Sequence, residues 1–106
     1  MSVAQLRTPP NSVEAERSVL TSILRDPLLA WPLASEVLTA EMFYRRDHAI
    51  VWEAIGSMMA GGREVDAVMV AEWITEQGKA AELRPSPLQF LGEMVSQSTS
   101  VPANVP

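Results

Sequence analysis

Apolar residues recur every three or four positions along this chain, in stretches bounded by residues that start or stop helices. This spacing places the apolar side chains on one face of a helix. The strict apolar-polar alternation that would predict a strand does not occur. With 106 residues, the chain has the length of one domain with one hydrophobic core. The sequence therefore predicts an all-α domain, a compact bundle of about five to six short helices.

Residues that cap or break helices separate these stretches. The predicted helical segments are 11–26, 28–38, 40–44, 47–60, 66–77 and 86–97. The first begins at Asn11 or Ser12 and ends at Asp26, because the residue before Pro27 is pushed out of the α-helical region. Pro32 weakens the second segment, since a proline inside a helix removes a backbone hydrogen bond.

The three last segments have clear start signals. Asp47 and Asp66 are predicted N-caps, because their side chains can accept a hydrogen bond from a free backbone N–H of the first turn. Ser86, followed by Pro87 and by Gln89 at the third helical position, predicts a full capping box. A glycine follows each of the two helices that begin with Asp, and we expect it to stop them.

The inward faces of these helices supply the predicted core. Its apolar residues are Val13, Ala15, Val19, Leu20, Ile23, Leu24, Ile50, Val51, Ala54, Ile55, Met58, Met69, Val70, Trp73, Ile74, Leu88, Phe90, Leu91, Met94 and Val95. Trp52 is also predicted to be buried, because it stands next to Val51 and three residues before Ile55 on the longest helix.

Charge and composition disfavour several functions. The net charge is −5, whereas a protein that binds nucleic acid by itself normally carries a basic face. The chain has no cysteine, which excludes disulfides, thiolate catalysis and cysteine-ligated zinc and fits a cytoplasmic location. No apolar run reaches the length of a membrane span, and the first ten residues have no apolar core of a secretory signal.

Candidate chemical sites are weak. Gly78-Lys79 is no phosphate-binding loop, because Trp73 and Ala80 stand where that motif needs a glycine and a hydroxyl. His48 next to Asp47 could be a general base, but adjacent helix residues do not face each other, so we interpret His48 as a residue packed between helical turns.

Glu72 and Glu76 could bind a divalent metal, but a solvated helix face explains them better, since a metal site usually needs more ligands. The sequence thus predicts no catalytic, cofactor-binding or metal-binding residue, and no enzymatic activity for this chain. The predicted partner interface consists of the basic pair Arg45 and Arg46 and of Met58 and Met59, a neighbouring pair that cannot both point into the core.

Five short motifs occur in collinear order. The first is Pro9-Pro10-Asn11-Ser12-Val13-Glu14-Ala15-Glu16, continued by Ser18-Val19-Leu20. The second consists of Met42-Phe43-Tyr44, His48 and Ile50-Val51-Trp52-Glu53-Ala54-Ile55, and the third of Gly62, Val65-Asp66 and Val70-Ala71-Glu72. The fourth is Phe90-Leu91-Gly92-Glu93-Met94, and the fifth is Pro102-Ala103-Asn104-Val105. Together they cover about residues 9–105 and resemble the N-terminal domain of DnaB-type replicative DNA helicases.

The chain departs from this family's pattern at two places. Glu41 and Met42 stand where the family often has an acid directly before the Phe. The segment Arg84-Pro85-Ser86-Pro87 replaces a pair of glycines before the last helix. We therefore expect an altered loop before that helix, while the cap at Ser86 restores a helix start by other chemistry.

The resemblance implies a helical domain in the collar of a hexameric ring, which pairs with a neighbouring subunit and docks the C-terminal domain of primase. In the family, an ATPase domain that uses ATP and Mg, and that contacts DNA, follows further along the chain. On this basis, residues 1–10 are predicted to be a flexible lead, 11–97 the collar and docking domain, and 98–106 the start of a linker or tail.

Two other classes of function stay open from the sequence. One is a similar helical docking domain at the helicase-binding end of a primase or in another replication factor. The other is a small independent enzyme or regulator. Pro9-Pro10 and the closing Pro102-Ala103-Asn104-Val105 favour the helicase domain over the primase domain.

Overall fold

A computed structural model describes residues 12–100 of the chain, with side chains up to Ser96. This part contains helices only, which confirms the predicted all-α fold. The elements in chain order are α1 (Val13–Arg25), α2 (Pro27–Ser35), the 3-10 turn η2 (Ala40–Met42), α3 (Arg46–Ala60), α4 (Ala67–Glu76), the 3-10 turn η3 (Ala80–Glu82) and α5 (Pro87–Ser100).

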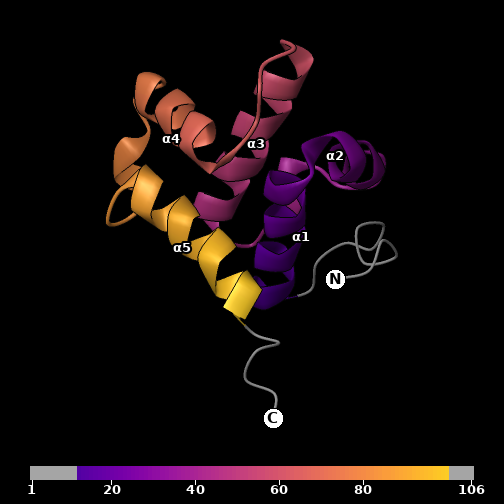
Figure 1. Cartoon of the computed structure of the whole chain (residues 1–106), viewed down its shortest axis with the longest axis horizontal. Helices are drawn as coiled ribbons and strands as arrows, with labels where there is room; N and C mark the ends of the chain where they lie inside the picture. The colour runs from indigo at the N-terminus through magenta and orange to yellow at the C-terminus, as the bar shows by residue number, and fades with distance from the viewer. Residues whose placement is uncertain (1–11, 101–106) are drawn as a thin grey trace.

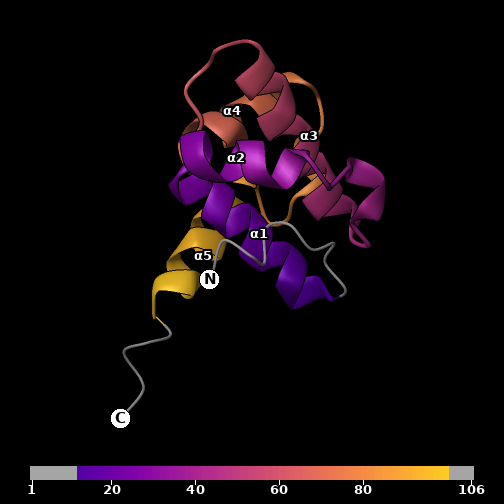
Figure 2. The ribbon, with the colours of Figure 1, turned by 90° about the vertical axis from the view of Figure 1, so that its right-hand side faces the viewer.

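Helix α3 runs through the middle of the bundle. Figure 1 shows α4 and α5 on one side of it and α1 and α2 on the other. Figure 2 looks onto α2, with α4 and α5 behind it. The apolar faces of α1, α3, α4 and α5 meet in one core, which includes Leu20, Ile55, Ile74 and Leu91, all fully buried. Trp52 is only 6% exposed, so its predicted burial is confirmed.

The predicted helix starts at two positions are confirmed by hydrogen bonds. The Ser12 hydroxyl accepts from the backbone N–H of Ala15 at 3.0 Å, so Ser12 is the N-cap of α1, and Asn11 lies outside the described residues. The Asp66 carboxylate accepts from the N–H of Met69 at 2.8 Å at the start of α4. Each bond satisfies a backbone donor that the first helical turn leaves without a partner.

Two predicted caps need correction. Helix α3 begins at Arg46 with Arg45 as N-cap and has no side-chain cap, because the carboxylate of Asp47 is held by the guanidinium of Arg45 instead. At the start of α5, the Ser86 hydroxyl accepts from the N–H of Gln89 at 3.2 Å. The side-chain NH2 of Gln89 donates to Glu93, and within the described residues its oxygen accepts no hydrogen bond from the backbone N–H of Ser86, so only half of the predicted capping box forms.

The inward face of α5 also differs from the prediction. Leu91 and Met94 are buried, but Leu88 is 55% exposed. Leu88 lies in the first turn of α5, where it lines a groove with the exposed Val68 of α4 instead of entering the core. Helix α5 continues to Ser100 rather than ending near Gln97. The predicted lead at 1–10 and residues 101–106 of the predicted tail lie outside the described residues.

Within residues 12–100, no helix combines the length and the apolar character that crossing a membrane requires.

We expect Asp66→Ala to lower the free energy of unfolding by about 1 kcal/mol, because the N–H of Met69 loses its hydrogen-bond acceptor. Urea unfolding of both proteins measures the difference, and Glu76→Ala, which removes an exposed carboxylate from the same helix, is the control. Equal stability of Asp66→Ala and the parent would show that the cap does not stabilise α4.

We expect Trp52→Ala to lower the free energy of unfolding by about 3–5 kcal/mol, since it leaves a cavity in the core. The indole of Trp52 packs against Trp31 and Phe43, with ring centroids 4.5 and 5.3 Å away. Trp52→Phe keeps an aromatic ring and should cost clearly less in the same urea titration. A cost of Trp52→Ala below about 1 kcal/mol would contradict its place in the core.

Candidate protein-docking site

The four residues of the predicted partner interface lie at opposite ends of α3. Arg45 and Arg46 stand at its start, whereas Met58 and Met59 belong to its last turn. With a rise of about 1.5 Å per residue, the two pairs are roughly 20 Å apart along the helix. They therefore form two separate surface regions rather than one patch.

Met58 does not reach the surface. Its side chain is fully buried, because Met58 follows Val51 and Ile55 at helical spacing on the inward face of α3. Met59 is half-buried and packs against the edge of the core. The predicted place of Met58 in the core is confirmed, so Met58 cannot also belong to the predicted partner interface, and little of the suggested methionine patch remains.

The basic pair belongs to a strongly exposed segment, residues 44–46. Tyr44 is 88% exposed, and the side chains of Arg45 and Arg46 are 47% and 70% exposed. Tyrosine and arginine are enriched among the residues that contribute most to protein–protein binding. An exposed tyrosine beside two arginines is thus a candidate docking site, and Tyr44 is a member that the sequence did not single out.

A buried carboxylate from α1 holds this segment in place. Glu16 is only 2% exposed, and it accepts hydrogen bonds from the backbone N–H groups of Tyr44 and, at 3.4 Å, of Arg45. Its Oε1 also lies 2.8 Å from Nδ1 of His48, which is equally buried. The segment is therefore fixed at its backbone while its side chains point to solvent.

The sequence contained a signal for Glu16 that the prediction did not use. Glu16 precedes Leu20 and Ile23 by four and seven residues, so it stands on the apolar face of α1. A carboxylate in such a position must find donors inside the protein, because an isolated buried charge is very costly. His48, interpreted from sequence as packed between turns, is one of these donors.

The geometry around His48 favours a structural role over proton transfer. Hydrogen bonding of Nδ1–H to Glu16 fixes the orientation of the imidazole ring. The crevice beside the ring has a volume of about 80 Å³ and is lined by Arg17, Arg45, Phe90, Glu93 and Met94, which include no hydroxyl or thiol nucleophile. The Glu16–His48 pair thus links α1 to the start of α3.

Ion pairs engage both arginines of the segment. The guanidinium of Arg45 donates to Asp47, which raises the pKa of Arg45. Burial acts to raise the pKa of Asp47, but the hydrogen bond from Arg45 and the attraction of His48 and Arg45 outweigh it, so this pKa lies below its usual value. Arg46 reaches Glu82 of η3 at 3.2 Å. Both arginines are held near the surface rather than extended freely into solvent.

The candidate metal site in the sequence consisted of Glu72 and Glu76. Glu72 and Glu76 are both exposed on α4, as the interpretation of a solvated face predicts. Over the residues that the structure describes, no group of three or more His, Asp or Glu side chains is arranged to hold a metal ion.

We expect His48→Ala to lower the free energy of unfolding by about 3–5 kcal/mol, because it leaves the carboxylate of Glu16 buried without its imidazole partner. The control is Asp47→Ala, which breaks an ion pair with an exposed arginine and should cost less than about 1 kcal/mol. Urea unfolding at neutral pH measures both. If His48→Ala and Asp47→Ala lower the free energy of unfolding equally, this would contradict a special role of the buried Glu16–His48 pair.

Comparison with known proteins places the chain in a family. The profile of the DnaB-like helicase N terminal domain matches residues 8–106. The Replicative DNA helicase DnaB of Geobacillus stearothermophilus is 33% identical over 99 residues, which are 93% of this chain and 21% of that protein. The protein of the same name from Rhodothermus marinus is 34% identical over 99 residues, 93% of this chain and 10% of its own length.

A third relative, the Replicative DNA helicase DnaB of Nostoc sp., is 39% identical over 70 residues, which are 66% of this chain and 8% of that protein. The chain thus spans about a fifth or less of the length of these relatives. Because the family profile covers nearly all of the sequence, the chain belongs to the DnaB-like helicase N-terminal domain family.

Proposed function

We propose that this domain is the collar and docking module of a hexameric replicative DNA helicase, where it contributes to ring assembly and binds the C-terminal domain of primase. The family membership of residues 8–106 and the names of the relatives support a role in DNA replication. The proposed place of action is the cytoplasm.

The chemistry of DNA unwinding belongs to other parts of the full protein in this proposal. This chain spans 21% and 10% of the length of two of the relatives, which leaves ample length for a motor domain. ATP and Mg would bind there, and contacts with DNA would also be made there. The net charge of −5 supports this division, because phosphate contacts need a basic surface.

The exposed segment 44–46 carries the docking proposal. Its backbone is fixed by Glu16, so binding through Tyr44, Arg45 and Arg46 would cost little ordering of the main chain. The side chains of Arg45 and Arg46 are already paired with Asp47 and Glu82, which holds them close to a defined position. Tyr44, Arg45 and Arg46 are therefore the proposed primase contacts, with Met59 as a distant and partly buried candidate.

The affinity of one isolated domain should be low. A transient interface of this kind buries about 1,200 Å² or less. In a ring, several linked copies raise the effective concentration of binding sites without any new contact. The proposal thus expects weak binding by the single domain and tighter binding by the assembled ring.

We expect the isolated domain to bind the cognate primase C-terminal domain with a Kd on the order of micromolar to hundreds of micromolar. Amide shifts in NMR spectra should cluster around residues 44–46, and Tyr44→Ala should weaken binding about tenfold without changing stability, since this side chain is 88% exposed.

Leu28→Ala is the matched control, because Leu28 is 80% exposed on α2, away from this segment. No shifts at hundreds of micromolar would contradict primase binding by this domain. Shifts confined to other helices would contradict only the choice of residues 44–46 as the binding surface. A loss of primase affinity on Leu28→Ala as large as that on Tyr44→Ala would contradict the same choice.

A further inference from the structure

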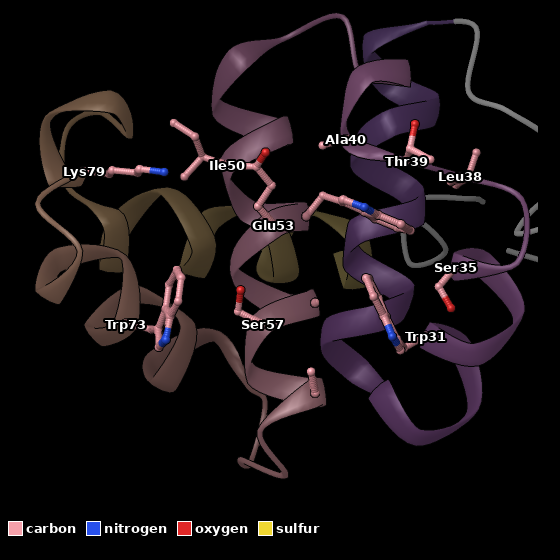
Figure 3. A pocket seen from close by; sticks show the side chains of 13 residues that line it. Trp31, Ser35, Leu38, Thr39, Ala40, Ile50, Glu53, Ser57, Trp73 and Lys79 are labelled. Carbon is pink, nitrogen blue, oxygen red and sulfur yellow. The ribbon is translucent and has the colours of Figure 1, made fainter.

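A surface groove with two tryptophan walls runs along the outer face of α3. Trp31 of α2 and Trp73 of α4 stand on opposite sides of α3, and Glu53 and Ser57 of α3 lie between them (Figure 3). The groove has a volume of about 670 Å³. This is large enough for several side chains of a binding partner.

The wall formed by Trp31 is held rigidly. Its indole packs at a tilt of 44° against the buried Trp52, with ring centroids 4.5 Å apart. It also lies against the backbone of Gly56, where a Cβ atom would come within 3.1 Å of the Trp31 ring. Gly56 therefore permits this close approach, and the half-buried indole presents a fixed apolar surface to the groove.

The floor of the groove has small side chains. Gly56, Ser57 and Ala60 lie on this face of α3, so a partner backbone can approach the helix closely. A partner strand would have no sheet edge to extend, because the described part of the chain is entirely helical. The shape thus suits a helix laid between two aromatic walls.

The charge of the groove is negative around its centre. Glu53 is exposed, and no hydrogen bond or ion pair engages its carboxylate among residues 12–96. Lys79 also lines the groove, where its side chain points from the α4 side toward Ile50 (Figure 3), and it forms no ion pair with Glu53. The carboxylate of Glu53 is therefore available to a cation of a partner. The chain's net charge of −5 also favours a basic partner.

We propose that this groove binds an amphipathic helix of a partner protein, with an arginine in its apolar stripe that pairs with Glu53 between Trp31 and Trp73. The apolar side chains of the helix cover the indoles, and its arginine meets the carboxylate of Glu53. Arginine fits better than lysine, because its planar guanidinium can stack on an indole and pair with a carboxylate through two parallel hydrogen bonds. This surface is separate from residues 44–46.

Indole N–H signals of the full chain in NMR spectra test this proposal. The probe is a capped helical peptide of about 16 residues, long enough to form helix, with leucines at helical spacing and one arginine in the leucine stripe. The matched peptide has citrulline, a neutral isostere, in place of the arginine. We expect the arginine peptide to shift the Trp31 and Trp73 signals below about 1 mM, and citrulline to weaken binding about tenfold.

Glu53→Gln should abolish the difference between the two peptides, whereas Glu72→Gln, at another exposed position, should preserve it. Ser57→Phe should block both peptides by filling the groove while leaving the fold intact, since Ser57 is exposed. Equal binding of the peptides to the parent protein, no shifts up to about 1 mM, or shifts outside the groove would overturn the proposal.

Two other candidate occupants of the groove are tested by NMR spectra of the protein without any peptide. If removal of residues 1–11, which include Leu6 and Arg7, shifts the Trp31 and Trp73 signals, the chain's own N-terminal segment fills the groove. If dilution of the protein shifts them, a second copy fills it. Either result would overturn the proposal of a partner helix.

Discussion

The buried carboxylate of Glu16 is the constraint on which much of this small domain depends. A charge inside an apolar core is tolerated only when hydrogen-bond donors surround it. Here the donors are the backbone N–H groups of Tyr44 and Arg45 and the imidazole of His48. Two segments that are distant in sequence, α1 and residues 44–48, thus meet at one carboxylate, and α3 starts at a fixed place although it has no side-chain cap. The exposed residues 44–46 take their backbone conformation from the same contacts.

Local chemistry explains why most of the helices could be predicted from the sequence. Helical spacing of apolar residues identified the stripes of α1, α3 and α4, because one face of a helix must be covered. The caps Ser12 and Asp66 were also predictable, since a cap bonds to backbone only three residues away. The family resemblance came from short motifs in the right order, which the family profile then confirmed over residues 8–106.

Most of the features that escaped prediction depend on contacts between distant segments. Asp47 is a local exception, because the guanidinium of Arg45, two residues away, holds the carboxylate that could otherwise cap the helix. The pairing of Glu16 with His48 joins residues 32 positions apart. The groove between Trp31 and Trp73 likewise requires the relative placement of α2, α3 and α4.

Native-state hydrogen exchange at two backbone amides tests the role of Glu16 most directly. The side chain of Tyr44 is 88% exposed, so an ordinary surface loop would exchange its amide proton rapidly. If the Glu16 carboxylate holds the segment, the amides of Tyr44 and Arg45 exchange about as slowly as core amides of α3 such as that of Ile55, and Glu16→Ala removes this protection. Rapid exchange of both amides in the unaltered protein would contradict the account.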